Sequence, residues 1–202
     1  MTATRNEATP DLFARQGYCI ARGFLEPVLT TYLWNYAVMK VVYQRLRGGD
    51  TAVPNSVTRY GDDAFEALLE TVRPRVEAVT GYRLFPTYSY FRMYLRGNAL
   101  GQHRDGPACE ISVSLNLGQS PERPWPLCLE GREGEISAAL HPGDALVYKG
   151  AELTHWREPY EGAQLGQVFL HYVDKNGPYA DRKFDGRGRL MSAEPAPADK
   201  AV

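Results

Sequence analysis

The pattern of apolar and polar positions changes near residue 82, and this change divides the chain into a helical front and a strand-rich back. In the front, two long segments carry apolar residues at helical spacing. One begins at Pro27 and stops at the glycines at 48–49, and the other follows the acidic pair at 62–63 and ends at Gly81. We expect Pro74 to kink or split the second helix.

From residue 84 onward, apolar residues recur at every second position, which is typical of strands with one apolar and one polar face. Predicted strands, separated by glycine and proline turns, cover 89–97, 109–118, 126–131, 134–140, 145–150, 153–159 and 164–174, with an earlier one inside 17–24. Such a series predicts a sandwich or barrel flanked by the front helices. The polar faces point either to solvent or into a wet interior, and the spacing leaves both open.

Composition and charge narrow the class of protein. The 202 residues are 44% hydrophobic with a net charge of −1, which fits one globular domain and gives no electrostatic footprint for nucleic acid or an anionic membrane. No apolar run approaches the roughly 20 residues of a membrane helix, and the N-terminus lacks an apolar signal core, so we expect a cytoplasmic protein. Flexible tails are expected at 1–10 and 191–202, around a single domain at 11–190.

Candidate chemistry lies in the second half of the chain, which contains all four histidines. The three cysteines are widely and unevenly spaced, a pattern that favours neither a disulfide framework nor a zinc site. His141 lies in a predicted turn, where a structural role is expected. His171 lies on a polar strand face, where it either contacts substrate or fills the mouth of a barrel.

The other two histidines combine with a carboxylate. His103 and Asp105 form an H-x-D unit, and in an extended segment residues two apart point the same way. His155 arrives 52 residues later on another predicted strand. Two histidines and one carboxylate on one face of a divalent metal leave positions open, which is the arrangement of non-haem iron oxygenases.

Four motifs together resemble a known family: HRD at 103–105, PGDALVYKG at 142–150, THWREP at 154–159 and QVFLHYVD at 167–174. They look like the core of the iron(II)- and 2-oxoglutarate-dependent dioxygenases, in the prolyl-hydroxylase-like branch. The resemblance covers roughly 84–175, with helical support over about 11–82. It implies a mostly β fold, a double-stranded β-helix (jelly-roll, cupin-like barrel) with two or three N-terminal supporting helices.

The resemblance also implies the reaction components. It implies Fe(II) as the metal, with 2-oxoglutarate and dioxygen as co-substrates. His103, Asp105 and His155 would then be the catalytic metal ligands, and the polar strand faces would point into the barrel.

The pocket for 2-oxoglutarate is where this chain departs from the family pattern. The far carboxylate of this dianion needs a cation inside the barrel, and a guanidinium suits it best. The branch supplies Arg or Lys about nine to eleven residues after the second histidine, where this chain has Gln, Leu and Gly at 164–166. A replacement must come from another strand. We expect Arg157 first, then Arg92, then Lys149.

Arg157 is preferred because it lies two residues beyond His155 and should share its inward face. The alternative is a surface ion pair of Arg157 with Glu158 or Glu161. Further co-substrate contacts are expected on the inward polar faces, with simple packing as the alternative for each: Tyr94, which matches by position a tyrosine of similar hydroxylases, Asn116 and Gln167.

The resemblance implies hydroxylation of an unactivated C–H bond in a small metabolite or amino-acid-like substrate, with release of succinate and CO2. A peptide or protein hydroxylase is the alternative within the family. Two alternatives lie outside this family: a cupin-like metal-binding barrel without turnover, and a metal-dependent enzyme that does not use 2-oxoglutarate. Candidate rim positions are Arg104, the 106–109 turn with Cys109, Trp125, Trp156 and the 50–60 segment.

Overall fold

The computed structural model describes residues 8–43, 48–121, 123–132 and 134–190. Most of the expected tails, 1–7 and 191–202, lies outside this part of the chain. Thr9 and Pro10 lie inside it and begin a helix, so regular structure starts earlier than residue 11.

The described part of the front contains three α-helices: α1 (Pro10–Gln16), α2 (Pro27–Tyr43) and α3 (Asp63–Thr80). Asp62 caps α3 by accepting a hydrogen bond from the Ala64 amide at 3.1 Å, and Gly81 ends it in the left-handed conformation that glycine adopts without strain. Pro74 lies inside α3, which runs unbroken from Asp63 to Thr80, so the helix is not split, and the alternative of a kink stays a prediction. The preceding helix was predicted to stop at the glycines at 48–49; α2 is described as far as Tyr43, residues 44–47 lie outside the described part of the chain, and 48–49 are not helical.

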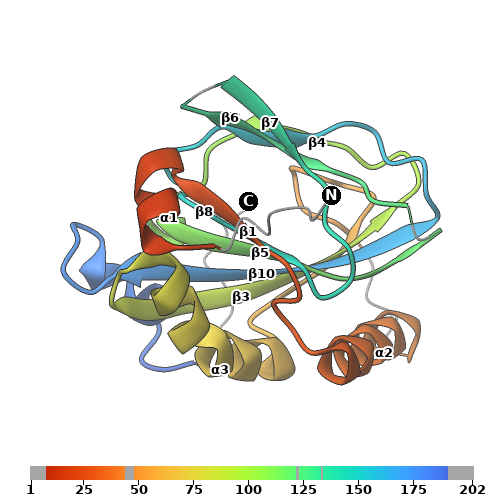
Figure 1. Cartoon of the computed structure of the whole chain (residues 1–202). Helices are drawn as coiled ribbons and strands as arrows, with labels where there is room; N and C mark the ends of the chain where they lie inside the picture. Colours follow the sequence, from red (N-terminus) through yellow and green to blue (C-terminus); the bar gives the residue numbers. More distant parts are fainter. Residues whose placement is uncertain (1–7, 44–47, 122, 133, 191–202) are drawn as a thin grey trace.

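Within the described residues, ten strands form two antiparallel sheets, which lie one above the other in Figure 1. The strands are β1 (Tyr18–Ala21), β2 (Val57–Tyr60), β3 (Leu84–Leu95), β4 (Leu100–His103), β5 (Ile111–Ser120), β6 (Leu127–Gly131), β7 (Gly134–Ala138), β8 (Ala145–Tyr148), β9 (His155–Arg157) and β10 (Gln164–Asp174). The larger sheet has the order β1-β8-β5-β10-β3-β2 and the smaller one β4-β9-β6-β7. Two short 3₁₀ segments follow β4 and β10, namely η1 (Pro107–Cys109) and η2 (Ala180–Gly186).

This architecture confirms the predicted jelly-roll with helical support. The short strands β2 and β4 and the helix α1 were not predicted, because four to seven residues are too few to show a clear period.

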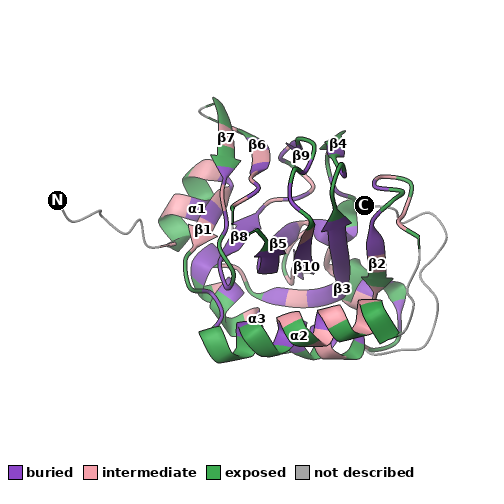
Figure 2. Cartoon of the chain, turned by 90° about the vertical axis from the view of Figure 1, so that its right-hand side faces the viewer, coloured by how far each residue is buried: buried purple, intermediate pink, exposed green. Residues whose placement is uncertain are grey.

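The two faces of the larger sheet pack against different cores, as the alternation of residues along its strands predicts. Phe91 and Met93 of β3 pack toward the helices, and the Phe91 ring stacks on Phe65 of α3 at 5.4 Å between ring centroids. Tyr90 and Tyr94 of the same strand belong instead to a second core between the sheets. In Figure 2 the buried strands β3, β5 and β10 accordingly lie between the helices and the smaller sheet. The polar faces therefore point into the barrel.

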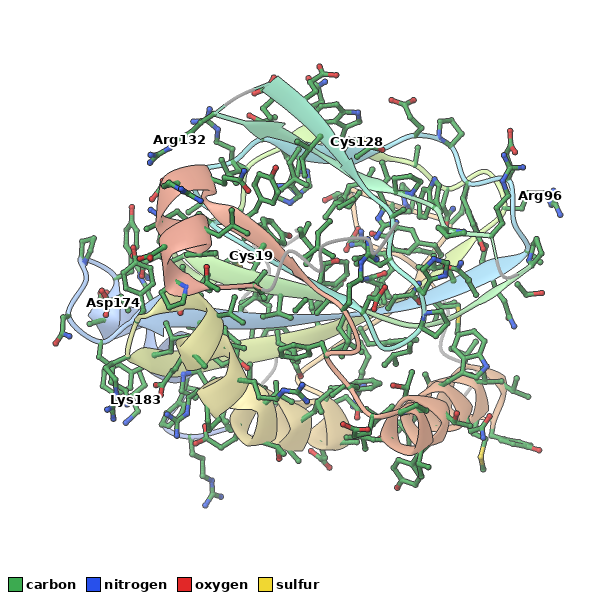
Figure 3. The ribbon with its side chains drawn as sticks, viewed as in Figure 1. Cys19, Arg96, Cys128, Arg132, Asp174 and Lys183 are labelled. Atoms are coloured by element: carbon green, nitrogen blue, oxygen red, sulfur yellow. The ribbon has the colours of Figure 1, made fainter. Side chains whose placement is uncertain are left out.

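The cysteines lie on separate elements. Cys19 is on β1, Cys109 in η1 and Cys128 on β6, and none of the three forms a disulfide. Figure 3 labels Cys19 and Cys128 on their separate strands. No helix in the described ranges combines the length and apolarity of a membrane span.

Candidate metal centre and active site

Strand pairing brings the H-x-D unit and the second histidine together. In the antiparallel pair β4–β9, His103 stands directly opposite His155, and their rings lie 4.2 Å apart between centroids. Asp105 follows β4 in a loop whose position is fixed by a 3.0 Å hydrogen bond from its amide to the Gly150 carbonyl. Oδ1 of Asp105 lies 3.6 Å from Nε2 of His103 and 3.5 Å from Nε2 of His155. Three ligand atoms thus converge on one point.

The two imidazoles are held in the tautomer that a metal requires. Nδ1 of His103 donates to the Gly101 carbonyl at 2.9 Å, and Nδ1 of His155 donates to the Leu153 carbonyl at 3.0 Å. Each Nε2 therefore carries the lone pair and faces Asp105. Apart from Asp105, the partner that the described residues offer to Nε2 of His155 is the Tyr148 hydroxyl, at a long 3.5 Å.

Asp105 is a carboxylate at neutral pH. Burial, the largest influence, would by itself raise its pKa, but the close approach of the His103 and His155 imidazoles outweighs burial and holds the pKa well below its usual range. Its other oxygen, Oδ2, accepts a hydrogen bond from the Ser112 hydroxyl at 3.0 Å. Oδ1 of Asp105 and Nε2 of His103 are both buried without a hydrogen-bond partner in the described structure. A divalent cation bound between them would satisfy both atoms, so the residues fit the metal that the resemblance implies.

Gly150 leaves room for this carboxylate. A Cβ atom at residue 150 would lie 2.3 Å from Oδ2 of Asp105 and 2.5 Å from Oγ of Ser112. We expect Gly150→Ala to displace the Asp105 side chain and to weaken Ni(II) or Co(II) binding at least tenfold, the scale seen when groups that orient ligands are lost. Isothermal titration of metal-free protein measures this.

The matched control is Gly106→Ala, which lies in the same loop as Asp105 but has no atom within 4 Å of the added methyl group. Its metal affinity should equal that of the wild type. Equal affinities for the two alanine variants would contradict the role given to Gly150.

A second group of potential ligands lies behind the first. The ligand atoms of Asp105, Cys109 and His171 also lie within 4.8 Å of one another, and all three residues are buried. The sulfur of Cys109 is 3.0 Å from the Tyr88 hydroxyl, and Nδ1 of His171 is 3.0 Å from the Ser112 hydroxyl. Burial lowers the pKa of His171 to about 4, so its imidazole is neutral. His171 thus supports the Ser112–Asp105 side of the site and does not line the open cavity.

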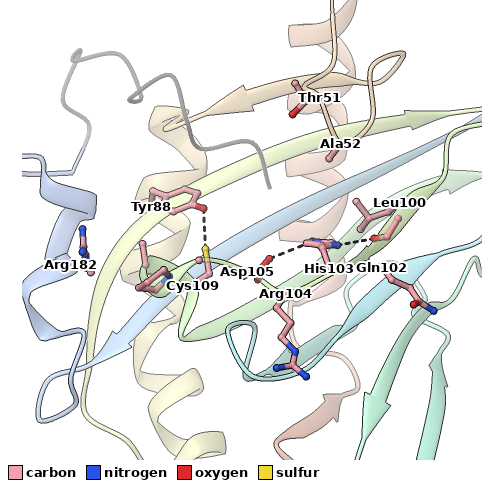
Figure 4. Close-up of a pocket in the computed structure, with 14 residues that line it drawn as sticks. Thr51, Ala52, Tyr88, Leu100, Gln102, His103, Arg104, Asp105, Cys109 and Arg182 are labelled. Carbon is pink, nitrogen blue, oxygen red and sulfur yellow. Dashed lines mark hydrogen bonds and ion pairs between the residues drawn. The ribbon is translucent and has the colours of Figure 1, made fainter.

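A cavity of about 580 Å³ opens on the first group (Figure 4). It is lined by Thr51, Ala52, Tyr88, Leu100, Gly101, Gln102, His103, Arg104, Asp105, Gly106, Pro107, Ala108, Cys109 and Arg182. The predicted rim is confirmed for Arg104, for the 106–109 turn and for part of the 50–60 segment, whereas Trp125 and Trp156 do not line this cavity. Arg182 was not predicted, because η2 has no periodic pattern that would place it beside the site.

Arg157 lies inside the barrel and has no acidic partner among the described residues. It is 2% exposed, its Nη1 donates to the Trp125 carbonyl at 2.5 Å, and its guanidinium lies 4.6 Å from the Trp125 ring centre. The surface pair with Glu158 or Glu161 is therefore wrong. Burial lowers the pKa of Arg157, which reflects the energetic penalty of an unpaired internal charge.

The other two candidate cations are already paired. Arg92 of β3 is equally buried, but its guanidinium bonds to the carboxylate of Asp50, which also accepts from the Tyr90 hydroxyl at 2.6 Å. Lys149 lies 3.0 Å from a carboxylate oxygen of Glu152. Of the three cations predicted from the sequence, Arg157 alone lacks a carboxylate in the described structure.

The three other predicted co-substrate contacts lie on the interior strand faces but differ in their partners. The Tyr94 hydroxyl is buried without a hydrogen-bond partner in the described chain. Gln167 of β10 accepts from Nη2 of Arg157 at 3.3 Å and donates to the Ser114 hydroxyl at 2.8 Å. The Asn116 amide donates to the Leu140 carbonyl and to Gln119, so both of its N–H groups are already used.

Comparison with known proteins gives one curated relative. No family model matches the chain. The uridine-5'-phosphate dioxygenase of an Amycolatopsis species is 27% identical over 125 residues, which are 57% of this chain and 46% of the relative. The chain therefore spans less than half the length of this relative.

Solved structures match over most of the chain. A prolyl-4-hydroxylase from Pseudomonas putida has a TM-score of 0.63 at 19% identity, covering 81% of this chain and 96% of that one. The epimerase SnoN, in complex with Fe3+, alpha ketoglutarate and nogalamycin RO, has a TM-score of 0.70 at 12% identity, covering 92% and 90%. The chain thus has the jelly-roll fold of the iron- and 2-oxoglutarate-dependent oxygenases, which confirms the resemblance at the level of the fold.

Proposed function

We propose that the chain is an iron(II)- and 2-oxoglutarate-dependent dioxygenase that hydroxylates a C–H bond of a small molecule and releases succinate and CO2. The observation that carries this proposal is the convergence of the half-buried His103 with the buried Asp105 and His155 beside an open cavity. The fold shared with oxygenases of this type supports it.

In this proposal the chain contributes a rigid, three-ligand site. Both imidazoles are oriented by backbone carbonyls, and Ser112 orients the carboxylate. When bound, iron(II) with 2-oxoglutarate and dioxygen would supply the oxidising chemistry. No side chain has to act as a general base in such a reaction, so the protein's task is to hold the ligands, to orient the substrate and to exclude water.

We propose Arg157 as the cation for the distal carboxylate of 2-oxoglutarate. A buried guanidinium without a carboxylate partner is unfavourable unless an anion joins it. Gln167 acts as a positioning residue, because it accepts from Arg157 on the strand where the family normally places its own cation. The Tyr94 hydroxyl, which is buried and has no hydrogen-bond partner among the described residues, is a further donor for the co-substrate, whereas Asn116 is proposed to position the neighbouring turn through its bond to Leu140.

A small molecule is the substrate class that the cavity supports, because about 580 Å³ lies in the range of small-ligand pockets. The curated relative acts on uridine-5'-phosphate, which also supports a small polar metabolite. One structural neighbour is a prolyl hydroxylase in complex with a peptide, so a peptide substrate is the second outcome to be tested.

The test is reconstitution of the purified protein with iron(II) under anaerobic conditions, followed by exposure to air with 2-oxoglutarate. We expect one metal ion per chain and slow succinate formation that requires both components. Metal binding without succinate formation, and without binding of 2-oxoglutarate to the metal-loaded protein, would identify a metal-binding barrel or an enzyme with another co-substrate. Succinate release stimulated by peptides and not by small metabolites would select the peptide hydroxylase.

A further inference from the structure

We propose that Asp105, Cys109 and His171 form a second metal site, which takes zinc(II). One ligand atom from each of these buried residues lies within 4.8 Å of the ligand atoms of the other two. A thiolate, an imidazole and a carboxylate are donors found in zinc sites, where three protein ligands leave a fourth position to water. The sulfur atom distinguishes this group from the first one, because thiolate ligands favour softer ions such as zinc(II).

The three donors come from separate elements that the fold brings together. Asp105 lies in the loop after β4, Cys109 ends η1, and His171 lies on β10. His171 stands opposite Ser112 of β5 in an antiparallel pair, and the Cys109 amide donates to the Gly106 carbonyl at 2.9 Å. Backbone hydrogen bonds thus fix the positions of the donors. The wide spacing of the cysteines in the sequence could not indicate the site, because its ligands meet only in the folded chain.

Hydrogen bonds leave one ring nitrogen of His171 with an unused lone pair. The Ser112 hydroxyl has a single hydrogen, which it donates to Oδ2 of Asp105 at 3.0 Å or to the Cys109 carbonyl at 3.3 Å. Nδ1 of His171, 3.0 Å from the same hydroxyl, must therefore donate to it. Nε2 then carries the lone pair, and it is buried without a hydrogen-bond partner in the described structure. A metal ion would satisfy this nitrogen, with Ser112 orienting the ring.

Cys109 gives the site its sulfur and its access. Among the described residues, it is the one cysteine that belongs to a group of possible metal ligands. Its sulfur lies 3.0 Å from the Tyr88 hydroxyl, and both residues line the cavity that opens on the first group of ligands (Figure 4). The cavity therefore gives an ion a path to the sulfur, and the Tyr88 hydroxyl is placed to donate to a metal-bound thiolate.

Asp105 belongs to both groups of ligands. Its Oδ1 faces the two histidines of the first group, at 3.6 and 3.5 Å from their Nε2 atoms. Its Oδ2 accepts from Ser112, which pairs with His171 on the next strand. Two cations would share one carboxylate, so zinc(II) at the second group would oppose metal binding at the first and inhibit the proposed reaction. The second site itself does not depend on the proposed function, because its ligands are side chains of this chain.

Titration of the metal-free full chain with cobalt(II) tests the site, because a cobalt–thiolate bond gives a near-ultraviolet charge-transfer absorption that imidazole and carboxylate ligands do not. We expect this absorption in the wild type, its suppression by zinc(II) and its loss in Cys109→Ser. Cys128→Ser is the matched control, since Cys128 lies on β6 outside any group of possible ligands in the described chain, and it should titrate like the wild type. No thiolate absorption in the wild type, or absorption that survives in Cys109→Ser, would overturn the proposal.

A second variant tests the imidazole donor. In His171→Asn, the affinity for cobalt(II), measured through the thiolate absorption, should fall at least about tenfold, because even the loss of groups that only orient ligands costs roughly 10- to 100-fold. Circular dichroism establishes that the variant is folded, and Cys109→Ser decides the question if it is not. An unchanged affinity in folded His171→Asn would remove the imidazole from the site and overturn the proposal.

Removal of the first metal site separates this inference from the proposed function. The full chain with both His103→Ala and His155→Ala lacks two of the three ligands of that site but should keep the thiolate absorption with cobalt(II). Loss of the absorption in this variant would show that the second group is not a site of its own, which would also overturn the proposal. If the absorption is present but the wild type forms no succinate with iron(II) and 2-oxoglutarate, the proposed function fails while the second metal site stands.

Discussion

His155→Ala is expected to abolish succinate formation and to lower the affinity for a divalent metal by at least about 100-fold, because even the loss of groups that only orient ligands costs roughly 10- to 100-fold. His155 is buried, its Nδ1 is tied to the Leu153 carbonyl, and its Nε2 is one of three atoms that face a common point. Without it, His103 and Asp105 would offer only two ligands. Metal content by mass spectrometry and titration with Ni(II) measure the change.

His141→Ala is the control, since it removes an imidazole from an exposed turn. The backbone amide of His141 bonds to Asp144, and this contact does not depend on the side chain. The variant should match the wild type in metal content and in succinate formation. Unchanged metal affinity in the His155 variant would refute the assignment of the metal centre, and loss of affinity in both variants would point to general unfolding.

The metal ligands were predictable from the sequence because their geometry follows from local rules. His103 and Asp105 are two residues apart at a strand end, and alternation makes such residues converge. The strand that carries His155 was predictable because turn residues flank it in the sequence. The alternation along β3 also predicted that Phe91 and Tyr94 lie on opposite faces of the strand. In the structure Phe91 packs on the helix side and Tyr94 lies in the interior.

What the sequence could not provide depends on long-range contacts. Arg92 and Arg157 are both arginines on interior strand faces, and nothing local distinguishes them. The difference is that Asp50, from a loop before β2, reaches the guanidinium of Arg92 and not that of Arg157. Arg182 was missed for the same reason, since its place beside the cavity depends on the contact between Asp185 and Tyr60.

This difference between the two buried arginines leads to a prediction with opposite outcomes for stability and for binding. In Arg157→Met, the Kd for 2-oxoglutarate in the Ni(II)-loaded protein should rise at least about 100-fold, because two charge-assisted hydrogen bonds of roughly 1.5–3 kcal/mol each are lost. Metal affinity should be unchanged, since Arg157 contacts Trp125 and Gln167 and no metal ligand. Titration with 2-oxoglutarate and with metal separates the two effects.

The thermal stability of the same variants shows whether Arg157 serves a ligand or the fold. Replacing an unpaired buried cation by a methionine of similar length removes a desolvation penalty, so the metal-free Arg157→Met protein should melt at the wild-type temperature or above it. Arg92→Met should instead lose about 3 kcal/mol of folding free energy, because it leaves the Asp50 carboxylate without its cation. A strong loss of stability in Arg157→Met, together with unchanged binding of 2-oxoglutarate, would show that Arg157 is a structural residue and would transfer the co-substrate role to another cation. An affinity that falls only in Arg92→Met would identify that cation as Arg92, released from Asp50 when the co-substrate binds.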